Sequence, residues 1–237
     1  MSPRDASTGN DMRKTLLPAL LAASLALAPA AMAHHPGEAL DAEMTAREQY
    51  FQPIDAPAPP FDLQDIEGNP VSLSDLADKV VVLDFVFATC TDLCPLQSEV
   101  LAEVQEKVNA SQMRDMVEFV TVTTDPAADT PEAMRAYGEA HGLDPANWTF
   151  LTLRPGDAAD ATRALSEAYA NSFTPTGDGQ QMHGAVFHVI DRGGRLAAKF
   201  HGLDFEPVNM VLYVNGLTNA PEAAEAGWWD RVTGLLD

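Results

Sequence analysis

The chain contains two cysteines, Cys90 and Cys94, which lie four residues apart in the stretch FVFATCTDLCPLQSEVL at 85–101. Two thiols at this spacing can form a disulfide, act as a redox pair or supply two ligands to one metal ion. If the stretch winds as a helix, the two Cα atoms are about 6 Å apart, which is within disulfide range. A disulfide across so short a loop would stabilise the fold little, because the stabilisation grows with loop length. The spacing therefore favours redox chemistry or metal binding over a structural staple.

The elements that must position these cysteines follow from the hydrophobic pattern. The apolar run at 80–87 predicts a buried strand, and apolar residues at helical spacing after Cys94 predict a helix. The other predicted elements are, in order, a hairpin at 61–73, a strand at 117–123, a helix at 130–141, a strand at 148–153, a helix at 157–169, a hairpin at 185–200 and a helix at 207–217.

This order of elements is the thioredoxin arrangement. It is an α/β fold with a mixed sheet, here with an N-terminal β-hairpin extension and an inserted strand–helix pair. The arrangement places Cys90 between the first core strand and its helix. A helix N-terminus stabilises negative charge, so at least one of the two thiols should ionise more readily than a free cysteine.

The beginning of the chain, residues 1–33, is predicted to be a secretory signal peptide. Basic residues after Met12, an apolar stretch at 16–28 and an A-x-A sequence ending at Ala33 are the parts of such a peptide. Met12 is an alternative start of translation. Cleavage after Ala33 predicts a soluble periplasmic protein without a stable membrane span. An uncleaved peptide that anchors the chain in the membrane is the alternative.

Three segments are expected after the signal peptide. Residues 34–60 should form an extended leader ending in PIDAPAPP at 53–60, because four prolines in eight residues exclude a helix or a central strand. A single domain is expected over 61–218 and a tail over 219–237. The 14 Lys+Arg and 35 Asp+Glu give a net charge of −21, which disfavours nucleic acid as a partner. We expect a monomer.

Three stretches together resemble the SCO/SenC family: FVFATCTDLCPLQSEVL, VTTDPAADTPEAM and QMHGAVFHVID. The resemblance covers about 61–217 and implies copper delivery to cytochrome c oxidase. It implies Cys90, Cys94 and His183 as the copper ligands. Thiolates favour Cu(I), and an imidazole suits either oxidation state. The acidic loop of the family falls on Asp125 and Asp129, expected to orient His183 or a substrate thiol from outside the ligand set. A turn role before the next helix is the alternative for Asp129.

Other potential ligands have weaker support. His188 lies in the middle of a predicted strand, where packing is the expected role. Met182 precedes His183 and offers either a thioether or a packing contact. After cleavage, His34 and His35 would present an amine and two imidazoles, a set that can hold Cu(II).

The predicted function is that of a periplasmic copper chaperone. It would supply copper to the binuclear copper centre of cytochrome c oxidase, or maintain the thiols of that centre. The expected partners are the copper-accepting oxidase subunit and another periplasmic copper donor. The alternative is a thiol–disulfide oxidoreductase in which Cys90 and Cys94 form the catalytic, redox-active pair. His183 separates the two hypotheses, because a copper site needs a histidine facing the cysteines and a dithiol reductase does not.

Overall fold

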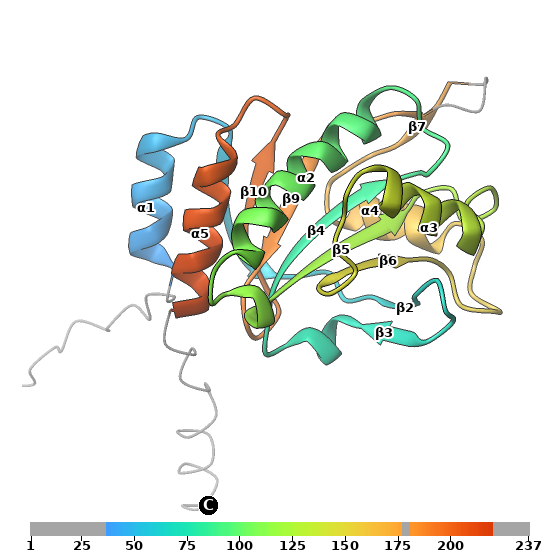
Figure 1. The fold of residues 1–237 in the computed structure, drawn as a ribbon, viewed down its shortest axis with the longest axis horizontal. Helices are drawn as coiled ribbons and strands as arrows, with labels where there is room; N and C mark the ends of the chain where they lie inside the picture. Colours follow the sequence, from blue (N-terminus) through green and yellow to red (C-terminus); the bar gives the residue numbers. More distant parts are fainter. Residues whose placement is uncertain (1–36, 177–180, 220–237) are drawn as a thin grey trace, which may run out of the picture. The chain divides into compact units, whose positions relative to one another are not determined.

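The computed structural model describes residues 37–176 and 181–219 (Figure 1). The predicted signal peptide, His34, His35 and the tail beyond residue 219 lie outside the described residues. At the centre is a six-stranded mixed sheet with the strand order β1-β10-β9-β4-β5-β6. Its strands are β1 Phe51–Pro57, β4 Val80–Val86, β5 Val117–Thr123, β6 Trp148–Leu151, β9 Val186–Ile190 and β10 Arg195–His201.

Strand direction divides the sheet into two parts. The strands β4, β5 and β6 run parallel to one another, whereas β9 is antiparallel to β4, and β10 and β1 continue the antiparallel part. Every residue of β4 and β5 is buried, as expected for parallel strands that are covered on both faces. The continuous apolar run that predicted β4 therefore reflects its central place in the sheet.

Two small hairpins lie outside the main sheet. The predicted hairpin at 61–73 forms from β2 (Asp62–Gln64) and β3 (Pro70–Ser72). Its residue Gln64 exchanges backbone hydrogen bonds with Thr152, at 2.9 and 3.0 Å, which fastens the hairpin near the end of β6. The second hairpin pairs β7 (Thr174–Pro175) with β8 (Gln181–Met182) and carries the chain to His183. The sequence indicated only a loop there.

Helices cover both faces of the sheet. The helices are α1 Glu38–Arg47, α2 Leu93–Asn109, α3 Pro131–Ala140, α4 Ala161–Ala168 and α5 Pro207–Asn219. Neighbouring residues of a strand point to opposite faces, and β4 illustrates this. Asp84 accepts a hydrogen bond from Gln97 of α2, whereas the ring of Phe85 contacts Tyr169 at the end of α4. Figure 1 shows α2 and α5 in front of the sheet.

The predicted fold class is confirmed. The thioredoxin-like core is β4-α2-β5, then α3, then β9-β10-α5, and the inserted pair consists of β6 and α4. The helix predicted at 157–169 begins later, at Ala161. Among the described residues, no helix combines the length and apolar character needed to cross a membrane.

The expectation of an extended leader over 34–60 is wrong at residues 38–47, which are helical, and the extended residues 51–57 belong to the main sheet. Residues 38–47 form α1, which packs against α5, and residues 51–57 form β1 at the edge of the sheet. The prolines exclude a central strand but not an edge strand, where one side of the backbone needs no partner. A bulge at Asp55, whose φ of 55° is left-handed, interrupts the pairing with β10.

Candidate metal centre

The two cysteines lie where β4 passes into α2. After β4 the chain turns, with a hydrogen bond from the Cys90 N–H to the Phe87 carbonyl at 3.0 Å, and α2 begins at Leu93. The N–H of Cys94, in the first turn of α2, donates to Cys90 Sγ at 3.3 Å. The sulfur of Cys90 therefore accepts one of the N–H groups that a helix start leaves without an intrahelical partner. The two cysteines are not joined in a disulfide.

Asp129, which follows the C-terminal end of β5, holds the loop that precedes the cysteines. Both of its carboxylate oxygens accept the Ala88 N–H, each at 3.0 Å, and one accepts the Thr123 hydroxyl at 2.5 Å. Asp129 is buried, and burial is the main cause that raises the pKa of its carboxyl group. Its side chain therefore supports the cysteine loop. Among the described residues, neither Asp129 nor Asp125 forms a hydrogen bond with His183.

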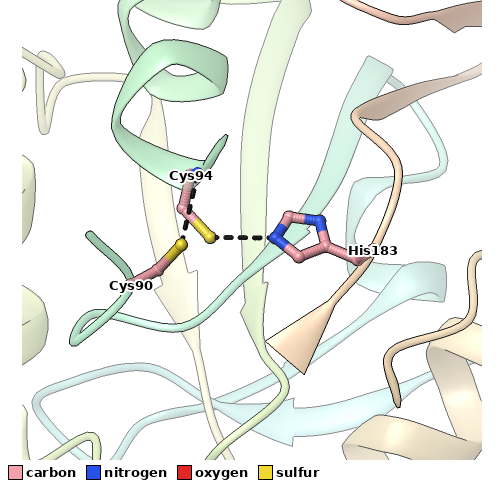
Figure 2. Close-up of side chains that lie close together, drawn as sticks. All are labelled: Cys90, Cys94 and His183. Carbon is pink, nitrogen blue, oxygen red and sulfur yellow. Dashed lines mark hydrogen bonds between the residues drawn. The ribbon is translucent and has the colours of Figure 1, made fainter. Parts of the chain in front are cut away.

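His183 faces the cysteines from the β7–β8 hairpin, as Figure 2 shows. Its Nε2 lies 3.3 Å from Cys94 Sγ, and its Nδ1 lies 3.3 Å from the carbonyl oxygen of Gly184. The imidazole stacks on the ring of Phe173, with the centroids 4.3 Å apart and the planes at 19°, and Phe87 approaches from the side. The ring is thus oriented by two aromatic contacts and one backbone carbonyl.

The three side chains that the sequence singled out meet at one point. The two sulfurs and a ring nitrogen of His183 all lie within 4.8 Å of one another. In the part of the chain that the structure describes, this is the one group of three or more His, Cys, Asp or Glu residues close enough to hold a metal ion. Two soft sulfurs and one imidazole are a donor set that suits copper or zinc.

The two thiols differ in acidity. The hydrogen bond from Cys94 is the largest cause that lowers the pKa of Cys90, to about 4, and contacts with His183 and with backbone N–H groups add to it against the effect of burial. The hydrogen bond to Cys90 and burial raise the pKa of Cys94. At neutral pH the pair therefore holds one thiolate, on Cys90, and one thiol proton. Binding a metal through both sulfurs would release that remaining proton.

The site is reached through an open cleft of about 730 Å³. Residues 90–93 line it from the cysteine side, and Thr176 and residues 181–183 line it from the hairpin side. Cys94 is fully buried and Cys90 is 7% exposed, whereas the side chain of Met182 at the rim is 67% exposed. A small ion or a partner side chain therefore meets Cys90 and His183 first.

His188 does not belong to this centre. It is fully buried in β9, and its ring nitrogens lie 3.3 Å from the Leu83 carbonyl and 3.2 Å from the Tyr169 carbonyl. Burial, with the nearby charge of Lys199 as a smaller cause, lowers the pKa of His188 to about 3. The ring is a neutral part of the core, in agreement with the packing role expected from the sequence.

Sequence reasoning missed three residues around the centre. Asp84 is fully buried beneath α2 and accepts a hydrogen bond from Gln97 Nε2 at 2.9 Å, and burial raises its pKa to about 6. A single acid inside the apolar run VVVLDFVF was the visible signal for it. Phe173, which stacks on His183, and Arg163, which binds the loop of Phe173, gave no signal because their partners are distant in sequence.

Comparison with known proteins agrees with this fold and site. The family model described as SCO1/SenC matches residues 52–217. The SCO1 protein homolog of Bacillus subtilis (strain 168) is 26% identical over 70% of this chain and 84% of that relative. The crystal structure of a SCO1/SenC family lipoprotein from Bacillus anthracis str. Ames superimposes with a TM-score of 0.64 and 26% identity, covering 71% of this chain and 98% of that one.

A second solved structure is Bradyrhizobium japonicum ScoI with copper bound. It has a TM-score of 0.56 and 27% identity, over 68% of this chain and 99% of that one. The family match extends over most of the residues that the structure describes, including β1 and both halves of the candidate centre. The chain belongs to the SCO1/SenC family.

Proposed function

We propose that this chain carries one copper ion on Cys90 Sγ, Cys94 Sγ and His183 Nε2 and delivers it during assembly of cytochrome c oxidase. The observation that carries the proposal is the convergence of these three atoms within 4.8 Å at the end of an open cleft. The copper-bound state of the Bradyrhizobium japonicum relative supports copper as the metal. Two thiolates favour Cu(I), and the imidazole keeps the site usable for Cu(II).

The chain's own groups prepare the site for its cargo. Cys90 is ionised at neutral pH, so one sulfur ligand is present before the metal arrives. If the His183 proton lies on Nδ1, where it can be donated to the Gly184 carbonyl, the lone pair of Nε2 points toward Cys94. Loading then requires only the loss of the Cys94 proton. Protonation of that sulfur would weaken the site again, which gives a route for release to a recipient.

The recipient and the location extend this proposal. The family resemblance implies the copper-accepting subunit of the oxidase as the recipient, and another periplasmic copper donor as the source. The sequence pattern at 12–33 supports export with cleavage after Ala33. The mature protein should then begin at His34 in the periplasmic fraction. An N-terminal sequence that retains residues 12–33 in the membrane fraction would replace this proposal with the anchored alternative.

A second function, thiol–disulfide exchange, is favoured by the acidity of Cys90. Its thiolate can attack one sulfur of a target disulfide, and the other target sulfur leaves as a thiolate that takes up a proton. Cys94 then loses its proton and attacks Cys90 in the mixed disulfide. The products are the reduced target and a Cys90–Cys94 disulfide, with two electrons moved to the target. This reaction needs the two cysteines, and His183 enters it only as one of the smaller causes that lower the pKa of Cys90.

One experiment separates the two functions. The reduced, metal-free protein is titrated with Cu(I) in competition with a chromophoric chelator, and with Cu(II) while the thiolate-to-copper charge-transfer band is recorded. His183→Ala should weaken Cu(I) binding and shift the band, and Cys90→Ser or Cys94→Ser should abolish it. The matched control is His201→Ala, which removes a histidine bonded to Gln52 at the β1–β10 edge. Reduction of a disulfide substrate that persists in His183→Ala, with no stoichiometric copper binding by the wild type, would favour the oxidoreductase.

A further inference from the structure

Arg163 ties together the segments that surround the histidine side of the centre. It lies in α4, and one guanidinium nitrogen donates to the Phe173 carbonyl and to Gln181 Oε1, both at 3.0 Å. The other terminal nitrogen donates to the Thr124 carbonyl at 3.1 Å, just beyond the end of β5. All three acceptors are neutral oxygens, and together they come from three different segments. We refer to these three hydrogen bonds as the Arg163 clamp.

The clamp holds the two residues that decide where the ring of His183 lies. Phe173 precedes β7, and its ring provides the face on which the imidazole stacks. Gln181 is the first residue of β8 and stands two residues before His183. A shift of either arm of the hairpin by about an ångström would separate His183 Nε2 from Cys94 Sγ, because ligand geometry is this sensitive to its support.

The third bond of the clamp connects the histidine hairpin to the support of the cysteines. Thr124 donates through its N–H and its hydroxyl to the Val86 carbonyl, at 2.8 and 3.3 Å, at the end of β4. Five residues later, Asp129 accepts the Ala88 N–H in the loop that leads to Cys90. The segment 123–129 therefore contacts the cysteine loop directly and the histidine hairpin through Arg163. Both halves of the centre are positioned against the same short piece of chain.

We propose that Arg163 is a positioning residue for the third metal ligand. Its clamp keeps His183 facing the two cysteines before any metal arrives, so that the site is assembled in advance. The consequence for copper rests on the proposed function, but the positioning itself is a property of the metal-free chain. A guanidinium suits this role because its planar fork can reach several acceptors at fixed angles, whereas a lysine ammonium is a compact charge on a flexible stem.

The test compares Arg163→Lys and Arg163→Gln with the wild type. Arg135→Gln is the matched control, because Arg135 is an exposed arginine whose guanidinium pairs with Glu67. The first readout is the NMR shift of the His183 ring protons in the reduced, metal-free protein, which the stacked ring of Phe173 displaces. We expect this displacement to be lost in both Arg163 variants and kept in the control. Loss in Arg163→Lys would show that the fork, and not the positive charge, is required.

The second readout is Cu(I) affinity by chelator competition. Changes that disturb the support of a ligand typically weaken metal binding by roughly 10- to 100-fold, and we expect an effect in this range for both Arg163 variants. If Arg163→Gln fails to fold, Gln181→Ala removes one acceptor of the clamp and should give a smaller change of the same kind.

Unchanged ring-proton shifts in the folded variants would overturn the positioning role, whatever the copper results. If the His183–Phe173 stacking were lost but the copper affinity were unchanged, Arg163 would not matter for metal binding. If the wild type binds no copper but the ring shifts respond as expected, the proposed function fails and the positioning role stands. The two ideas therefore fail separately.

Discussion

Replacing Asp84 with Asn should change how the stability of the chain depends on pH. Asp84 is fully buried between β4 and α2, and one of its carboxylate oxygens has no hydrogen-bond partner among the described residues. Burial raises its pKa from 3.8 to about 6, although the side chains of Thr121 and Gln97 act to lower it. At neutral pH the folded chain therefore carries a buried negative charge that the unfolded chain would hold in water.

The size of the effect follows from this shift. Because the folded-state pKa is raised, the contribution of Asp84 to stability is fully present below pH 3.8 and is lost as the pH rises through about 6. A shift of about two pKa units corresponds to about 3 kcal/mol at most. Asparagine does not ionise, so the stability of the variant relative to the wild type should rise by about that amount between pH 4 and pH 7. His188 titrates in the opposite direction, which is why the difference between the two proteins is the quantity to measure.

The assay is urea unfolding of the reduced, metal-free protein from pH 4 to pH 8. The wild type, Asp84→Asn and the surface control Asp78→Asn are compared at each pH. The free energy of unfolding of Asp84→Asn, minus that of the wild type, should increase as the pH rises. For the control, the same difference should stay constant with pH. If the Asp84→Asn and wild-type curves were also parallel over this range, Asp84 would not be the buried charge described here. If the free energy of unfolding of Asp84→Asn relative to the wild type instead increased as the pH fell, the folded state would stabilise the carboxylate form of Asp84.

Three other outcomes are expected. Asp129→Ala should lower the free energy of unfolding by about 2–5 kcal/mol, because the Ala88 N–H and a threonine hydroxyl lose their buried acceptor; a loss below 1 kcal/mol in thermal unfolding would contradict this. Gly138→Ala should destabilise α3 although alanine favours helices, because the added methyl would overlap the Trp148 ring; a rise in melting temperature would refute the clash. Oxidation that joins the two cysteines should abolish copper binding at this site, as metal titration of the disulfide form can check, since both sulfurs are consumed.

The parts of the fold that sequence patterns predicted have a strong hydrophobic pattern. β4 is apolar except for Asp84, β5 is rich in β-branched residues, and α2 has apolar residues at helical spacing, so the core and the place of Cys90 and Cys94 could be expected. His183 was identified only through the family resemblance, because its position beside the cysteines depends on contacts across 89 residues. No local pattern specifies such a contact.

The N-terminal elements were missed for a different reason. Helix α1 has only two large apolar residues, Leu40 and Met44, and its buried residues are Met44 and Asp41, whose carboxylate accepts the Tyr213 hydroxyl at 2.6 Å. Strand β1 contains two prolines, which are compatible with an edge. Asp129 was expected to orient His183 or a substrate thiol, or else to take part in a turn before α3; in the structure its carboxylate accepts a backbone N–H of the cysteine loop. A carboxylate's partner cannot be deduced from spacing when that partner is a main-chain group 41 residues away.

The edge position of β1 has a practical consequence for anyone who expresses this domain. A shortened chain beginning at Phe61, where the recognisable motifs start, would lose both α1 and β1. The unpaired backbone of β10 would then be open to strands of other molecules, and the rings of Phe200 and Tyr213, which now contact Phe51, would face water. Such a product would tend to aggregate, and its failure could be mistaken for a defect of the metal centre, which lies where β4 passes into α2. Expression should begin before Glu38, so that the proline-bearing edge strand continues to shield the sheet.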